Sequence, residues 1–168
     1  MHHFFVSPDQ ITGSTIVITG RDVSHIGSVL HMKPGEKIAV SDGEDRDYYA
    51  VLTEVGRDCV RAEIETEAAD TELPASLILY QGLPKGDKME LILQKAVELG
   101  AVRIVPVAMK RSVVRLDERK QENRIRRWQA IAESAAKQSG RGRIPEVSPV
   151  LTMQEAVREA AALDRLIV

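Results

Sequence analysis

The residues best suited to chemistry lie in two stretches that combine glycine with positive charge. Residues 86–100 open with Gly-Asp-Lys and continue as an amphipathic segment, and residues 138–145 read Gln-Ser-Gly-Arg-Gly-Arg-Ile-Pro. Glycine lets the backbone approach a ligand closely, and a guanidinium group donates paired hydrogen bonds to a phosphate or a base edge. The two stretches together favour an enzyme that acts on nucleic acid.

Each stretch also has a purely structural interpretation. Lys85 and Lys88 flank a turn that leads into a predicted helix N-terminus, which suits an anion but also suits an ordinary strand-to-helix turn. Gly140 suits the end of a helix, and in that case Arg141 and Arg143 are simply solvated surface charges. The local sequence leaves both interpretations open.

Positive charge is concentrated in the second half of the chain. Residues 1–72 hold 6 Lys or Arg against 14 Asp or Glu, whereas residues 73–168 hold 17 against 11. The segment 109–143 alone carries 11 basic and 4 acidic residues. Such a run is often a solvated helical face, but beside the Gly/Arg stretch it predicts binding to a polyanion. Arg124 and Arg127 lie on adjacent turns of a predicted helix and form an outward basic ridge.

Composition disfavours several other classes of protein. The single cysteine, Cys59, excludes an internal disulfide and a cysteine-rich metal site. The four histidines are His2, His3, His25 and His31, too few at workable spacing for a metal site, so we expect no metal. No apolar run approaches the ~20 residues of a membrane span. The N-terminus shows no basic-then-apolar leader, so we do not expect export. We therefore expect a cytoplasmic protein that does not bind membranes.

The predicted elements divide the chain near residue 70. Residues 1–70 alternate short β-type runs with turns, which is typical of a small closed barrel. One short helix interrupts them, opening at Asp22 and placing His25, Ile26, Val29 and Leu30 on a common side. Residues 66–75 are acidic, contain proline and lack apolar periodicity, so we interpret them as a linker. We expect domains at 1–70 and 74–168.

Residues 74–168 follow a strand–helix–strand pattern. Strands are expected at 77–80, as a buried parallel strand, and at 103–107 and 166–168. Helices are expected from Asp87 to Gly100, from near Asp117 to Gly140, and after a cap formed by Thr152 and Glu155. The first helix has an apolar stripe of Met89, Ile92, Leu93, Ala96 and Leu99, and the second turns Ile125, Trp128, Ala132 and Ala135 inward. The pattern predicts an α/β domain with a largely parallel sheet, whose ligands bind at the carboxyl ends of the strands.

These motifs, taken in order, resemble those of a known family. The resemblance rests on Phe4-Phe5-Val6, His25 with Val29-Leu30, Lys33-Pro-Gly35, residues 85–90 and 94–100, Arg111-Ser112, Arg127-Trp128 and residues 138–145. The family is RsmE, which comprises methyltransferases that modify a uridine of small-subunit (16S) ribosomal RNA at N3. The resemblance implies an α+β protein of two domains, a PUA-like β-barrel followed by a SPOUT-type α/β domain. It also implies S-adenosylmethionine as cofactor and a homodimer with a C-terminal trefoil knot.

The resemblance also suggests roles for individual residues. The predicted RNA-binding residues are His25, Lys85, Lys88, Arg111, Arg124, Arg127, Gln138, Arg141 and Arg143. Arg141 and Arg143 are also the candidates for a catalytic role, because either guanidinium group can stabilise a uridine anion or anchor a phosphate.

This chain departs from the family at several places. His3, His31 and Lys137 stand where the family commonly has arginine, arginine and glutamate, which affects single RNA contacts. The family's Gly-Pro-Glu-Gly-Gly cofactor loop is expected after Val168, so we assign no cofactor-binding residue to residues 1–168. We expect this fragment by itself to be inactive. The alternatives are a non-catalytic RNA-binding or ribosome-associated module, and a small α/β protein that binds another anion at Lys85.

Overall fold

The computed structural model describes residues 1–43, 46–70, 72–109 and 118–163. The chain forms two compact units, Met1–Glu72 with Gly140–Arg143, and Leu73–Ser139 with Ile144–Val168. The expected strand at 166–168 and Arg111 lie outside the described residues. No helix of the described part is long and apolar enough to cross a membrane.

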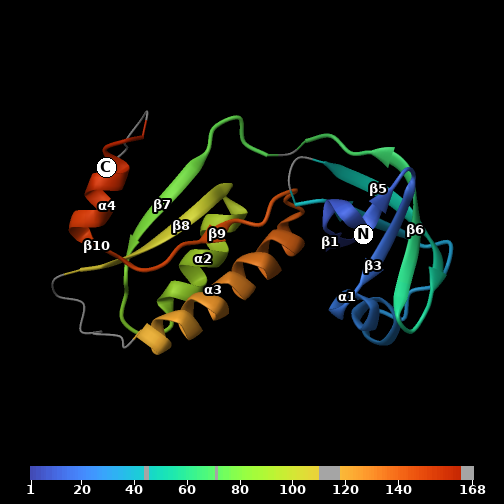
Figure 1. Ribbon diagram of the computed structural model, residues 1–168, viewed down its shortest axis with the longest axis horizontal. Helices are drawn as coiled ribbons and strands as arrows, with labels where there is room; N and C mark the ends of the chain where they lie inside the picture. Colours follow the sequence, from blue (N-terminus) through green and yellow to red (C-terminus); the bar gives the residue numbers. More distant parts are fainter. Residues whose placement is uncertain (44–45, 71, 110–117, 164–168) are drawn as a thin grey trace. The chain divides into compact units, whose positions relative to one another are not determined.

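The N-terminal unit is built on one six-stranded sheet (Figure 1). Its strands are β1 (His2–Phe5), β2 (Ile11–Thr12), β3 (Thr15–Thr19), β4 (Lys37–Ser41), β5 (Asp47–Val55) and β6 (Cys59–Glu67). They pair in the order β1-β4-β5-β6-β3-β2, with β1 parallel to β4 and the other neighbours antiparallel. A short 3₁₀ helix, η1 (Pro8–Gln10), precedes β2.

Strands from both ends of this sheet bury their side chains in one core. Phe4 of β1 and Ile16 and Ile18 of β3 belong to the same buried cluster, although β4, β5 and β6 separate the two strands in the sheet. The sheet therefore curls around its core. Alternation along β5, where Tyr48, Ala50 and Leu52 are buried, supplies the inward face.

The predicted helix between β3 and β4 is present, but its start and its buried face differ from the prediction. It begins at Arg21, one residue before the predicted Asp22, as α1 (Arg21–Ser24), and continues as a π-helical turn, η2 (His25–Val29). The wider turn shifts the phase of the side chains, so Ile26 is fully buried while Val29 is 62% exposed. The common apolar side predicted with Val29 is therefore wrong.

The second unit contains a four-stranded, wholly parallel sheet. Its strands are β7 (Leu77–Gly82), β8 (Ala101–Ala108), β9 (Glu146–Val147) and β10 (Leu151–Thr152). The sheet has the order β10-β8-β7, and β9 also pairs with β8. In the described part β8 is the sole strand neighbour of β7, which leaves Leu77 44% exposed and the rest of β7 half-buried. The prediction of a fully buried strand at 77–80 is wrong for this reason.

The described part of this unit also contains the helices α2 (Lys88–Glu98), α3 (Glu118–Ser139) and α4 (Met153–Ala160). α2 and α3 pack side by side against the sheet, whereas α4 contacts β8 and β10 (Figure 1). Asp87 occupies the predicted N-cap position of α2 but forms no side-chain capping bond, whereas Thr152 and Glu155 form the predicted capping box. In α2, Val97 is buried while Leu99 is 73% exposed, so the predicted stripe is wrong at its last position.

The inward face of α3 is largely as predicted. Trp128, Ala132 and Ala135 are buried, together with Ala136, and Ile125 is half-buried. The helix ends at Ser139, and Gly140 follows with a φ of +70°, the left-handed conformation that glycine adopts without strain. This turn directs the next three residues into the N-terminal unit.

Candidate nucleic-acid interface

The Gly140–Arg143 loop is part of the N-terminal unit. Arg141 is 6% exposed, and its guanidinium group forms a two-point ion pair with Glu72. Nε donates to Oε1 over 3.0 Å, and Nη2 contacts Oε2. The backbone N–H of Arg143 donates to the same Oε1 over 3.3 Å. Glu72 therefore binds both the side chain and the backbone of this loop.

The middle residue of the loop packs against a second carboxylate. A Cβ atom added to Gly142 would lie 2.6 Å from Oδ2 of Asp47, so the position has no room for a side chain. The hydroxyl of Ser41 donates to Oδ1 of Asp47, and Nε2 of His3 lies 2.6 Å from the same hydroxyl. The carboxylate thus links the loop to strands β1, β4 and β5.

The remaining predicted residues around this loop are exposed. The side chain of Arg143 faces solvent, as does that of Gln138 in the last turn of α3. Ser139 turns its hydroxyl back to the carbonyl oxygen of Ala135 over 2.7 Å. The loop therefore presents Arg143 to solvent, and the last turn of α3 presents Gln138. Arg141 faces inward.

A second basic surface lies at the other end of α3. Lys85 in the loop after β7 and Lys88 in the first turn of α2 are both exposed. Glu90, also in the first turn of α2, pairs with Arg127 of α3 at 2.6 Å, which brings Arg127 beside these lysines. Arg124, one turn earlier on α3, is exposed. We define these four basic residues, Lys85, Lys88, Arg124 and Arg127, as the α2–α3 basic surface.

The α2–α3 basic surface is placed by the parallel sheet. Gly82 pairs with Val107, and Thr152 pairs with Ala108, so β7, β8 and β10 end at one edge. Lys85 follows that edge directly, as expected for a ligand-binding loop of an α/β domain. Gln138 lies about 21 Å from Arg124 along the helix axis, at about 1.5 Å per residue. Gln138 and the α2–α3 basic surface therefore lie toward opposite ends of α3.

His25 lies on the N-terminal unit. Its side chain is exposed in the π-helical turn and packs edge-on against Phe4, with ring centroids 6.3 Å apart. His31, nearby in the sequence, has a φ of +54°, a conformation that residues other than glycine rarely adopt. Unusual backbone of this kind concentrates at functional sites, and no pattern in the residues around His31 predicts it.

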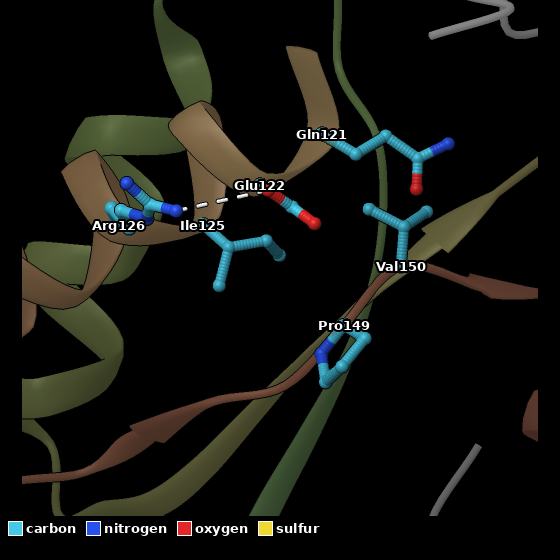
Figure 2. Close-up of a pocket in the computed structure, with 6 residues that line it drawn as sticks. All are labelled: Gln121, Glu122, Ile125, Arg126, Pro149 and Val150. Carbon is cyan, nitrogen blue, oxygen red and sulfur yellow. Dashed lines mark ion pairs between the residues drawn. The ribbon is translucent and has the colours of Figure 1, made fainter. Parts of the chain in front are cut away.

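One cavity of about 450 Å³ opens beside the start of α3. It is lined by Gln121, Glu122, Ile125, Arg126, Pro149 and Val150 (Figure 2). Arg126 points toward Glu122, with 3.7 Å between Nη2 and Oε2. None of these six is a predicted site residue, and the charged pair largely neutralises itself.

A polar cluster that the sequence did not reveal joins α4 to the sheet. The hydroxyl of Tyr80 donates to Oε1 of Glu159 over 2.8 Å, and Arg103 forms an ion pair with the same carboxylate. The Tyr80 hydrogen bond, followed by that from Arg103, lowers the pKa of Glu159, whereas burial raises the pKa of Tyr80. Arg103 also donates to the hydroxyl of Ser148 over 2.8 Å. These groups support packing and lie on strands and a helix far apart in sequence.

A metal site would need several His, Cys, Asp or Glu side chains close together. Within the described ranges no three such residues come together in a way that could hold a metal ion.

Comparison with known proteins decides the family. Residues 71–168 match the family described as an RNA methyltransferase domain, and residues 18–65 match the RNA methyltransferase PUA domain. The chain belongs to this RNA methyltransferase family. The expected PUA-like domain followed by a domain with a parallel sheet is therefore confirmed.

Relatives within the family confirm the resemblance to RsmE. Ribosomal RNA small subunit methyltransferase E of Bacillus subtilis is 37% identical over 92% of this chain and 60% of its own length. The protein of the same name from Mycobacterium bovis is 32% identical over 95% of this chain and 62% of its own length. The chain thus spans about three-fifths of the length of these relatives.

A solved structure supports the same relationship as these two relatives. The crystal structure of a ribosomal RNA small subunit methyltransferase E from Neisseria gonorrhoeae, bound to S-adenosyl methionine, matches with a TM-score of 0.81 and 36% identity. The match covers 99% of this chain and 66% of that one.

Proposed function

We propose that this chain binds small-subunit ribosomal RNA and belongs to an enzyme that methylates a uridine of that RNA at N3, with S-adenosylmethionine as methyl donor. The observation that carries the proposal is the α2–α3 basic surface, which lies at the carboxyl edge of the parallel sheet in an RNA methyltransferase domain. Support also comes from relatives named for small-subunit ribosomal RNA methylation and from a related structure that contains the methyl donor.

The reaction needs an anion-stabilising environment. Uridine N3 carries a proton, which must leave as the bond from the methyl carbon to N3 forms. S-adenosylmethionine, when bound, supplies an electrophilic methyl group on a sulfonium sulfur. The protein's part is to position the base, exclude water and stabilise the developing negative charge on the uracil ring. Arg143, as an exposed guanidinium group, is our candidate for that electrostatic role.

The described residues fit the cofactor only in part. Met109, directly after β8, is 43% exposed, and its Cγ would lie 3.2 Å from a Cβ added to Gly82. The Met109 side chain therefore packs over Gly82 and offers one apolar contact at this edge of the sheet. We propose that residues 1–168 alone bind RNA without transferring methyl groups, since the cofactor loop that the resemblance implies is expected after Val168.

RNA contact is assigned to exposed basic and polar side chains at three places. On the α2–α3 basic surface they are Lys85, Lys88, Arg124 and Arg127; near the loop they are Gln138 and Arg143; on the N-terminal unit it is His25. Arg111 is added from the sequence alone. Most of these contacts would be to phosphate and would give affinity without sequence specificity, while the PUA-like unit recognises the shape of the RNA. We further propose a cytoplasmic homodimer as the working form of the enzyme.

Methyl transfer tests the proposal directly. The protein at its natural length is incubated with radiolabelled S-adenosylmethionine and small ribosomal subunits that lack the modification, and the RNA is digested to nucleosides. We expect label in 3-methyluridine. Label in another nucleoside would refute the N3 assignment, and RNA binding without label would favour a non-catalytic RNA-binding module. Residues 1–168, tested in parallel, should bind RNA and remain unlabelled.

A further inference from the structure

The environment of Arg141 differs from that of a phosphate-binding arginine. Its side chain is 8% exposed and forms two contacts to one carboxylate, and the side chain of Glu72 is itself 11% exposed. A phosphate contact would require the guanidinium group to leave this pair. Glu72 would then remain as a largely buried carboxylate without its main partner, which is strongly unfavourable.

The same contacts fix the backbone of the loop. Glu72 accepts the N–H of Arg143, and Gly142 packs on the carboxylate of Asp47. Three successive residues of the loop are therefore held by the N-terminal unit, and the side chain of the third, Arg143, faces solvent. Fixing the backbone of a loop before the ligand arrives reduces the entropy lost on binding.

From this geometry we infer that Arg141 is a positioning residue for RNA binding: its ion pair with Glu72 holds the Gly140–Arg143 loop so that Arg143 meets the RNA. The inference rests on the proposed function and assigns different roles to two arginines with the same sequence context. It also gives a role to Glu72, an acidic residue that would otherwise be expected to oppose RNA binding.

The substitution Glu72→Gln separates the two roles of Arg141. If Arg141 bound RNA directly, removal of its competing carboxylate would leave RNA affinity unchanged or increase it. If Arg141 positions the loop, Glu72→Gln weakens binding by about ten-fold, a loss of the size expected when a short loop must be ordered on binding. The measurement is fluorescence anisotropy with a labelled hairpin of small-subunit ribosomal RNA. Asp58→Asn, which removes one exposed negative charge from the same unit, is the matched control and should not weaken binding.

The effect should depend on Arg143. In an Arg143→Gln background, we expect Glu72→Gln to change RNA affinity by less than about two-fold, because the residue that the ion pair positions is gone. General destabilisation of the unit would instead weaken binding equally in both backgrounds. Arg141→Lys, which keeps the charge but loses the two-point geometry, should weaken binding several-fold and serves if Glu72→Gln does not fold.

The outcomes distinguish this inference from the proposed function. If the unaltered chain does not bind the hairpin, the RNA-binding proposal fails, and the inference fails with it. If the chain binds and Glu72→Gln and Arg141→Lys bind equally well, the inference alone is overturned. Equal weakening by Glu72→Gln with and without Arg143 would also overturn it.

Discussion

The structure directly constrains the type of residue 142, which is glycine. The space that a side chain would need is taken by the carboxylate of Asp47, which also accepts a hydrogen bond from Ser41. In Gly142→Ala the carboxylate must move, and that hydrogen bond is strained or lost. We expect this variant to lower the free energy of unfolding by about 1–3 kcal/mol, as measured by urea denaturation.

Gly27→Ala is the matched control for that substitution. Gly27 lies in the π-helical turn with an ordinary φ, and an added Cβ would meet the Cγ1 atom of Val55 at 3.5 Å, a normal contact. Its effect should lie within about 0.5 kcal/mol of zero. A loss in Gly27→Ala as large as that in Gly142→Ala would contradict the argument from Asp47.

At the scale of single residues, the sequence predicts local backbone geometry better than it predicts contacts between residues far apart in the chain. Gly140 was predicted to end a helix, and the left-handed conformation it adopts is set by its neighbours in the chain. The partner of Arg141 is Glu72, 69 residues away, and the sequence contains no local signal that pairs them. The same holds for Gly142 and Asp47. The residue types of the Gly/Arg loop were therefore predictable, but the burial of one arginine was not.

At the scale of elements, α4 is attached to the sheet by a carboxylate whose pKa is lowered. The hydrogen bond from Tyr80 comes first among the causes, ahead of Arg103. A carboxyl group with a lower pKa in the folded state binds fewer protons than in the unfolded state, so its stabilisation is present above the unfolded pKa. It is lost as pH falls through the folded pKa. In Tyr80→Phe we expect the free energy of unfolding to fall less steeply as the pH drops below about 4.5, the ordinary pKa of the carboxyl group.

Acid titration followed by circular dichroism checks this expectation. Tyr49→Phe removes the hydroxyl of an exposed tyrosine in the other unit and should leave the acid profile unchanged. An identical acid profile in Tyr80→Phe and the unaltered chain would show that Glu159 does not contribute through this hydrogen bond.

The N-terminus of α4 gives a second prediction at this scale. The hydroxyl of Thr152 accepts the N–H of Glu155 over 3.3 Å, and Glu155 accepts the N–H of Thr152 over 2.8 Å. Thr152→Ala should destabilise the unit by about 1 kcal/mol, whereas Thr152→Ser, which keeps the hydroxyl, should have little effect. Thermal unfolding of the pair of variants measures the difference, and equal midpoints would contradict a capping role.

Elements were predicted best where their signals are local. The capping box of α4 and the inward face of α3 follow from side chains three or four residues apart, so the sequence contained them. The π-helical turn of η2 and the half-exposed β7 depend on packing and on the number of strand neighbours. The two-residue strands β9 and β10 are too short to show an alternating pattern. All of these needed the folded structure.

At the scale of the whole chain, acidic and basic residues are distributed unevenly along the sequence. The acidic N-terminal unit binds the Gly/Arg loop through Glu72 and Asp47, while the basic residues of α2 and α3 face solvent. RNA affinity should therefore fall steeply with salt, since each phosphate contact releases counterions.

Variants of the exposed arginines test this division of charge. Arg124→Gln and Arg143→Gln should each flatten the plot of log affinity against log salt by about 0.7–0.9, the contribution of one phosphate contact. Lys37→Gln is the control, because Lys37 is an exposed lysine of the N-terminal unit that already pairs with Glu65 at 2.6 Å. Its slope should match that of the unaltered chain. If all three variants keep the slope of the unaltered chain, RNA is bound elsewhere on the chain. A flatter plot in Lys37→Gln alone would instead place a phosphate contact at Lys37 of β4.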